Sequence, residues 1–197
     1  DLEYLVEEKP SDQIELSGGY GAGMIVGTLG LSFNNFSLRN VFNPAAYRPL
    51  PSGDGQRLSI RAQASGLYYQ NYSFSFVEPW LGGKKPNSLT TMIYHSITTN
   101  GSSDAEERTS FKVTGAGLGL GKRLAWPDDY FTNYTELSYR YYLVDNYPGF
   151  LYKEGHSNNV SIKTVVGRSS SGPNPIFPTM GSEMSVSIEL TPPYSLF

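Results

Sequence analysis

Residues 71–86 read NYSFSFVEPWLGGKKP, and this stretch decides the fold class. Large aromatic side chains stand at every second position, at Tyr72, Phe74 and Phe76, with small residues between them. A period of two places the aromatics on one face of a β-strand and the serines on the other. A buried strand of a soluble protein would seldom show this pattern, whereas a strand between lipid and a wet lumen requires it. The stretch therefore predicts a transmembrane strand.

A turn rich in Pro and Gly follows this strand and carries Trp80. A second tryptophan, Trp126, stands before Pro127 in a similar turn. Tryptophan and tyrosine gather where a membrane meets water. We therefore expect an aromatic girdle at the membrane interface, formed by Trp80, Trp126, Tyr72, Phe74 and Phe76.

The composition agrees with a barrel that spans a membrane. Charged residues make up 17% of the 197 residues, below the usual quarter of soluble domains, and aromatic residues make up 14%. Hydrophobic residues at 39% are too few for a helical membrane protein, and no run of about 18 apolar residues predicts a membrane-spanning helix. The 21 glycines and 13 prolines suit many strands and turns.

Charge and cysteine content exclude several classes of function. The net charge of −3 gives no electrostatic support for a nucleic-acid partner. The absence of cysteine excludes disulfides, thiolate metal sites and thiol catalysis, and it fits a protein that crosses an oxidising periplasm. No signal peptide opens the chain, so we expect that Asp1 lies inside a longer protein or follows a processing site.

Alternation along the chain predicts about nine strands and almost no helix. Several approach the 9–11 residues that a tilted membrane strand needs, longer than the average of about 5–6 in soluble proteins. The expected strands are residues 13–21, 24–33, 56–66, one from Asn71, and residues 88–99, 108–120, 130–144, 156–168 and 183–190. The predicted fold is all-β: an antiparallel, up-and-down transmembrane β-barrel, present here as a partial barrel.

The connections between these strands alternate between two classes. Residues 34–55, 78–87, 123–129 and 169–182 carry Pro and Gly, two of them with a Trp, whereas residues 67–71, 100–107 and 145–155 are rich in Asn, Ser, Asp and Glu. Successive turns of an up-and-down barrel lie on opposite sides of the membrane, so two alternating classes are expected. The connection 34–55 is longer than a periplasmic turn usually is.

Five segments, in this order, resemble the BamA family of outer-membrane assembly factors in the Omp85 superfamily. They are LVEEKPSDQIELSGGYG, NNFSLRN, YSFSFVEPWLGGKKP, NPIFPTMGS and MSVSIEL. Residues 17–21 resemble the first barrel strand, and EPWLGG at 78–83 resembles the turn after the fourth. FPTMGS at 177–182 resembles the family's F-P-T-x-G turn. The charged residues 1–12 resemble the end of the last periplasmic POTRA domain with its linker, which leaves residues 13–197 as the N-terminal half of the barrel.

The resemblance also implies residues beyond this chain. The family barrel has about sixteen strands. Its R-G-F/Y motif does not occur here, and its usual place lies beyond Phe197. An open nine-stranded sheet would expose two edges, which lipid does not tolerate. We therefore expect the native protein to continue after Phe197.

By resemblance, the function is the insertion of client outer-membrane proteins through a lateral gate, without covalent chemistry. The implied partners are client proteins, accessory lipoproteins or other subunits, and outer-membrane lipid or lipopolysaccharide. The location is the Gram-negative outer membrane, with the N-terminal segment in the periplasm. Clients would pair with the first strand, whose glycines weaken it. The implied gate residues are Gln13, Ile14, Glu15, Leu16, Ser17, Gly18, Gly19, Tyr20 and Gly21.

Other candidate sites carry ordinary structural interpretations. His95 and His156 have no carboxylate in a ligand spacing, so we expect lumen or loop residues and no metal or cofactor. Arg57, Arg61 and Arg140 are expected to face the lumen and to pair with Glu136 or Glu183, although a charge-lined pore is an alternative. The glycines of GAGLGLG at residues 115–121 are expected to permit close packing inside the barrel, and no hydrolase motif is present.

Two further functions stay open on the sequence alone. One is a passive porin or substrate channel, and the other is a soluble β-sandwich that binds a ligand such as a carbohydrate. A sandwich could show the alternation of residues 56–66 with its polar side in bulk water. A second protein layer packed on the apolar rows would decide for the sandwich.

Overall fold

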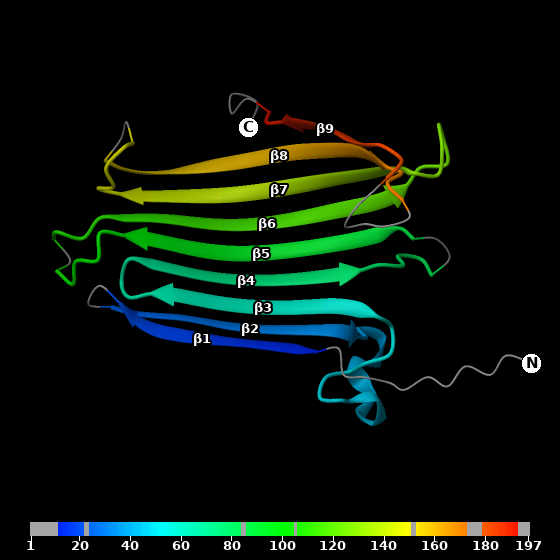
Figure 1. Ribbon diagram of the computed structural model, residues 1–197. Helices are drawn as coiled ribbons and strands as arrows, with labels where there is room; N and C mark the ends of the chain where they lie inside the picture. The colour runs from blue at the N-terminus through cyan, green and yellow to red at the C-terminus, as the bar shows by residue number, and fades with distance from the viewer. Residues whose placement is uncertain are drawn as a thin grey trace, which may run out of the picture.

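The computed structural model describes residues 12–21, 24–83, 86–104, 106–150, 153–172 and 179–192. In this part of the chain, nine strands form one antiparallel sheet in the order of the sequence (Figure 1). They are β1 (Gln13–Gly21), β2 (Met24–Phe36), β3 (Gln56–Ser65), β4 (Tyr69–Glu78), β5 (Ser88–Thr99), β6 (Ser110–Arg123), β7 (Phe131–Asp145), β8 (Glu154–Ser169) and β9 (Glu183–Leu190). The all-β, up-and-down fold is confirmed, and the open sheet is a partial barrel.

The strand register assembles the apolar positions of all strands into one belt. Phe74 of β4 pairs with Ile60 of β3 and with Ile93 of β5, and directly paired residues share a face. The belt continues through Leu118 of β6 and Leu137 of β7. We call this face the outer face.

The opposite face of the sheet carries small and polar side chains. Ser75, beside Phe74 on β4, pairs with Ser59 of β3 and with Met92 of β5. Further along, this face carries the odd-numbered glycines of β6 and the polar side chains of β7. We call it the inner face. The two faces match the contrast between lipid and lumen that the alternation predicts.

The sheet is a single layer. Among the described residues no hydrophobic side chain is buried. On the outer face Leu16 is 81% exposed, Ile93 51% and Leu118 48%. No second sheet or helix layer of the described chain covers this face (Figure 1). The β-sandwich interpretation is therefore wrong.

Several strands differ by a few residues from the sequence expectation. β2 continues to Phe36 through an irregularity in its register with β3 between Phe33 and Phe36. β4 begins at Tyr69 because three residues, Gly66, Leu67 and Tyr68, form the tight connection from β3, with Gly66 at a φ of 54°. β6 begins two residues later and ends three residues later than expected, at Arg123. Hydrogen-bonded partners on neighbouring strands, rather than side-chain alternation, decide these ends.

The two classes of connection lie at opposite ends of the sheet, as predicted. The connections β2–β3, β4–β5, β6–β7 and β8–β9 share one end, where β1 begins, which we call the proline-rich end (Figure 1). The connections β3–β4, β5–β6 and β7–β8 share the opposite end. Residues 1–11 of the POTRA-like segment 1–12 lie outside the described residues, and so do residues 173–178, which contain most of the NPIFPTMGS motif.

The long β2–β3 connection is a compact, hydrogen-bonded unit. It contains two short 3-10 helices, η1 (Arg39–Phe42) and η2 (Pro44–Ala46). The Ser37 hydroxyl is fully buried, donates to Asp54 at 2.6 Å and accepts from the Asn40 amide at 3.1 Å. The Gln56 side chain joins the unit to β4 by donating to Glu78 at 2.6 Å. Within the described segments, no helix is both long and apolar enough to cross a membrane.

Candidate functional site

The first strand is an edge of the sheet. β1 pairs only with β2 among the described strands, and all nine of its residues are exposed. These residues are the nine predicted gate positions, Gln13, Ile14, Glu15, Leu16, Ser17, Gly18, Gly19, Tyr20 and Gly21. An edge strand presents unpaired backbone N–H and C=O groups, which another strand can satisfy.

The two faces of β1 follow those of the sheet. Ile14, Leu16 and Tyr20 are 77–81% exposed and lie on the outer face, where Leu16 pairs with Leu29 of β2. Gln13, Glu15 and Ser17 alternate with them and lie on the inner face. A strand that pairs with the free edge of β1 would therefore continue both the apolar belt and the polar face.

The second half of β1 has few side-chain contacts. Gly18 lies opposite Gly27 of β2, so this register position has no side chain on either strand. A Cβ at Gly19 or Gly21 would meet no atom within 4 Å. Glycine within a strand weakens it because the residue has no side chain to pack.

The first half of β1 is tied to the sheet by an ion pair. The Arg61 guanidinium of β3 donates to the Glu15 carboxylate of β1, across the intervening strand β2. Gly30 of β2 lies between them in the register, and a Cβ there would come within 3.2 Å of the Glu15 carboxylate. The predicted pairing of Arg61 with Glu136 or Glu183 is wrong, because the register places Glu15 in its reach.

A second inner-face ion pair also differs from the prediction. Arg140 of β7 lies 3.9 Å from the carboxylate of Glu189 on β9. Glu136 instead accepts a hydrogen bond from the Tyr134 hydroxyl at 3.1 Å. The expected pairing of Arg140 with Glu136 or Glu183 is therefore wrong as well. Arg140 and Glu136 are four positions apart along one strand, too far for direct contact in an extended chain.

The odd-numbered glycines of β6 lie in a row on the inner face, where tyrosines from the neighbouring strands cover them. A Cβ at Gly115 would collide with the Tyr94 ring of β5, and a Cβ at Gly119 would collide with the Tyr134 ring of β7. Both glycines are buried although the sheet is a single layer. The close packing expected of these glycines is confirmed.

The five predicted interface aromatics fall into two groups. Tyr72, Phe74 and Phe76 lie on the outer face within β4. Trp80 and Trp126 lie in turns at the proline-rich end and are 53% and 82% exposed. Both tryptophans thus lie at one end of the sheet, whereas their position at a membrane interface stays a prediction.

Both histidines lie on the outer face, and the expectation of lumen or loop positions is wrong. His95 pairs in register with Tyr72, and its Nδ1 lies 2.8 Å from the Thr114 hydroxyl. His156 pairs with Leu143, and its ring centroid lies 6.1 Å from that of Tyr141. Both histidines lie in the halves of their strands that are nearer the opposite end of the sheet. The described residues hold no cluster of three or more potential metal ligands.

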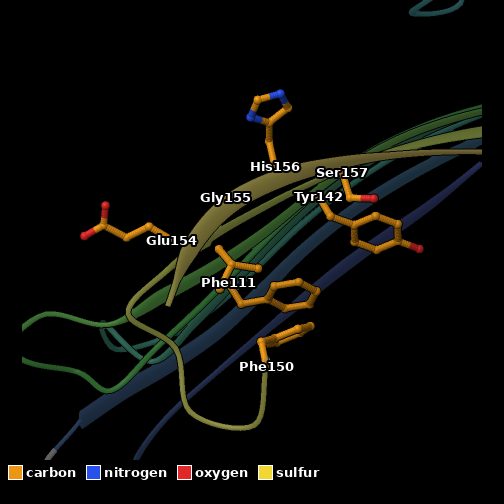
Figure 2. A pocket seen from close by; sticks show the side chains of 8 residues that line it. Phe111, Tyr142, Phe150, Glu154, Gly155, His156 and Ser157 are labelled. Atoms are coloured by element: carbon orange, nitrogen blue, oxygen red, sulfur yellow. The ribbon is translucent and has the colours of Figure 1, made fainter. Parts of the chain in front are cut away.

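An aromatic cluster covers the inner face at the opposite end, and the alternation of the strands does not predict it. The β7–β8 connection returns over the sheet, so that Phe150 and Phe111 lie with ring centroids 5.0 Å apart (Figure 2). Tyr142 stacks on Phe111 at 6.1 Å, and Tyr147 completes the cluster. His156 points to the other side of the sheet in this view. Two aromatics in a polar connection, at Tyr147 and Phe150, were the available signal.

A charged contact closes the β6–β7 turn at the proline-rich end. Arg168 of β8 donates to the Asp128 carboxylate at 2.9 Å, and the Tyr130 amide donates to the same carboxylate at 2.9 Å. Desolvation raises the pKa of Asp128, but the hydrogen bonds from Arg168 and Tyr130 and the positive charge of Arg168 together lower it below its ordinary value of 3.8. The carboxylate is therefore charged at neutral pH.

Comparison with known proteins agrees with this geometry. BamA from Haemophilus ducreyi lacking POTRA domains 1–3 has a similar fold, with a TM-score of 0.58 at 20% sequence identity. The alignment covers 95% of this chain and 35% of that structure, so the chain spans about a third of the BamA chain. No curated protein matches the sequence. The family model of the Omp85 superfamily domain matches residues 52–196. The chain therefore belongs to the Omp85 superfamily.

Proposed function

We propose that this chain is the N-terminal part of an outer-membrane β-barrel that inserts client outer-membrane proteins, and that β1 is its lateral gate. The superfamily and the BamA-like barrel fold support a general role in outer-membrane protein assembly. The observation that carries the gate is the edge position of β1 together with the glycines of its second half, where Gly18 lies opposite Gly27 with no side chain on either strand.

The physical argument rests on the backbone. A client strand that enters hydrocarbon with unpaired N–H and C=O groups pays several kcal/mol for each group. Pairing with the free edge of β1 satisfies these groups on one side of the client strand. The alternating faces of β1 also specify the register, because a slip by one residue would turn the apolar side chains of the client toward the lumen.

The gate works without covalent chemistry in this proposal. In the closed barrel β1 meets the last strand at a seam, and Gly18, Gly19 and Gly21 lower the cost of opening it. The proline-rich end faces the periplasm, where a POTRA domain leads into β1. Accessory lipoproteins or other subunits assist there, and the exposed outer face contacts outer-membrane lipid and lipopolysaccharide.

Cross-linking of a client in the full-length protein tests the proposal. A photo-reactive amino acid placed at Gln13 or Ser17 of β1 is expected to capture the terminal strand of a client during its assembly. The same probe at Ser138, in the middle of the sheet on β7, is the matched control and is expected to capture none. A disulfide that locks β1 to the last strand is expected to stop assembly.

Client capture on β1 and the effect of the locking disulfide separate the insertase from the passive channel. A channel carries solute without client adducts on β1, and it keeps its conductance when the seam is locked. Full client assembly by the locked barrel contradicts the gate. Equal client capture at Gln13 and Ser138 contradicts the selective role of the edge strand.

A further inference from the structure

We infer that Glu15 and Arg61 are positioning residues that brace the gate strand, so that β1 keeps its pairing with β2 while its other edge opens. This inference rests on the proposed gate function. The ion pair between these residues spans three strands and holds one half of β1 against β2. The other half of β1 is free to separate from β2.

The ion pair is placed to resist separation of β1 from β2. Glu15 and Arg61 share the inner face, and each pairs in register with Gly30 on β2 between them. The bond between their side chains therefore passes over β2 and joins β1 directly to β3. Moving β1 off β2 breaks this bond together with the ladder at that position.

Gly30 leaves the path between the two charges open. A Cβ at Gly30 would come within 3.3 Å of the Glu15 Cβ and 3.9 Å of the Arg61 Nε. A larger side chain would stand in the line of the bond. Glycine weakens β2 at this point, and the ion pair that passes over it supplies a lateral connection in its place.

The brace acts on one half of β1 only. Near the same end, the Asp12 carboxylate accepts a hydrogen bond from the Asn34 amide at 3.2 Å. In the other half, Gly18 lies opposite Gly27, so neither strand has a side chain at that position. A Cβ at Gly19 or Gly21 would meet no atom within 4 Å. Separation of β1 from β2 therefore begins at Gly21 and stops at Glu15. The braced half lies at the proline-rich end.

Such a brace answers a requirement of strand exchange. An edge strand that accepts a client must release the last strand of the barrel from its free edge and keep its pairing with β2. Without β2 in place, β1 is no template for the client. The two side chains are about half exposed, 51% for Glu15 and 53% for Arg61, so water in the lumen screens them. An exposed pair of this kind changes a local opening equilibrium about two- to fivefold.

Disulfide formation within the full-length protein in native membranes measures the brace. Ser17 of β1 and Thr28 of β2 are register partners, and this chain has no cysteine, so S17C with T28C reports their pairing. E15Q or R61Q is expected to slow this disulfide about two- to fivefold. The reversed pair E15R with R61E restores the rate, which simple removal of packing would not do. G30L keeps both charges and is expected to slow the disulfide as the single variants do.

Two controls separate the brace from general loosening of the sheet. R140Q removes a second inner-face ion pair of the described residues, far from β1, and leaves the S17C–T28C rate unchanged. The pair S138C with S161C, whose native hydroxyls are 2.8 Å apart, forms its disulfide equally fast in all variants.

The disulfide measurement needs no client, so the brace can be refuted independently of the proposed function. Unchanged rates in E15Q, R61Q and G30L overturn the brace, and so does a double reversal as slow as E15Q. Absence of client adducts at Ser17 in the wild-type protein instead overturns the gate and leaves the measured brace standing as a structural feature. When both hold, client capture falls in E15Q by the same factor as the disulfide rate.

Discussion

The ring of Tyr94 lies across Gly115, in the space that a β-carbon on that residue would occupy. The two residues are direct register partners on β5 and β6. A flat tyrosine against a glycine buries the glycine without a second protein layer. This arrangement recurs where Tyr134 covers Gly119, so the middle of the sheet is held by tyrosines that lie along the inner face.

Replacing Gly115 with Ala is expected to displace the Tyr94 ring and to lower the free energy of unfolding of the full-length barrel by about 1–3 kcal/mol. Gly117→Ala is the matched control, because a Cβ there lies 3.5 Å from the Glu136 carboxylate, an ordinary contact. Urea unfolding in detergent micelles, followed by tryptophan fluorescence, measures both variants. Equal stability of the two variants would show that Tyr94 moves aside without cost.

A lysine on the outer face should be far more harmful than a lysine on the inner face. Ile93 lies in the apolar belt beside Phe74, and its neighbour Met92 lies on the inner face opposite Ser75. Ile93→Lys is expected to destabilise the folded barrel in lipid by about 2–4 kcal/mol, the cost of a charge near the middle of the bilayer. Met92→Lys faces the lumen and is expected to be nearly neutral. Unfolding in vesicles of the full-length protein compares them, and similar losses for both would contradict the assignment of faces.

The Asp128–Arg168 contact gives a pH dependence with a definite sign. The pKa of Asp128 is lower in the folded protein than its ordinary value of 3.8, so the contact stabilises the β6–β7 turn fully above pH 3.8. This stabilisation is lost as the pH falls through the lowered pKa. Asp128→Asn is therefore expected to be less stable than wild type at pH 7 and equal to it once the pH lies well below the lowered pKa of Asp128. Unfolding at both pH values measures this, and a difference that persists in strong acid would assign the effect to packing.

Ser37 is expected to hold the long β2–β3 connection together. Ser37→Ala removes the buried hydroxyl that joins Asp54 and Asn40 and leaves their polar groups without it, at a cost of about 1–3 kcal/mol. The local opening should speed proteolytic cleavage within residues 37–55. Phe42→Ala is the control in the same connection, because Phe42 is 95% exposed and packs little. Faster cleavage in Phe42→Ala than in Ser37→Ala would place the stabilising contacts elsewhere.

Much of the fold could be predicted from alternation alone. The period of two at Tyr72, Phe74 and Phe76 identifies the outer face of β4. The same rule identifies each of the remaining strands of the sheet. Because each strand pairs with the next one in the chain, the order needed no long-range information. The proline-rich and polar connections likewise indicated which loops share an end.

The partners of charged groups could not be predicted in the same way. Glu15 and Arg61 lie 46 positions apart and meet only because two registers, β1 with β2 and β2 with β3, place both at Gly30. An error of two residues in either register would move Glu15 out of reach. The polarity of the two histidines favours lumen or loop positions, whereas the parity of their strand positions places both on the outer face. The return of Phe150 over Phe111 depends on the path of a connection, which alternation does not describe.

Every described strand contacts only the strands before and after it in the chain. The hairpin is consequently the smallest unit that evolution could duplicate or delete here without moving all later loops to the other side of the membrane. A single inserted strand would reverse the side of every loop downstream, whereas an inserted pair leaves each at its original side. Such a gene can thus change the circumference of its barrel in steps of two strands while its loops evolve separately.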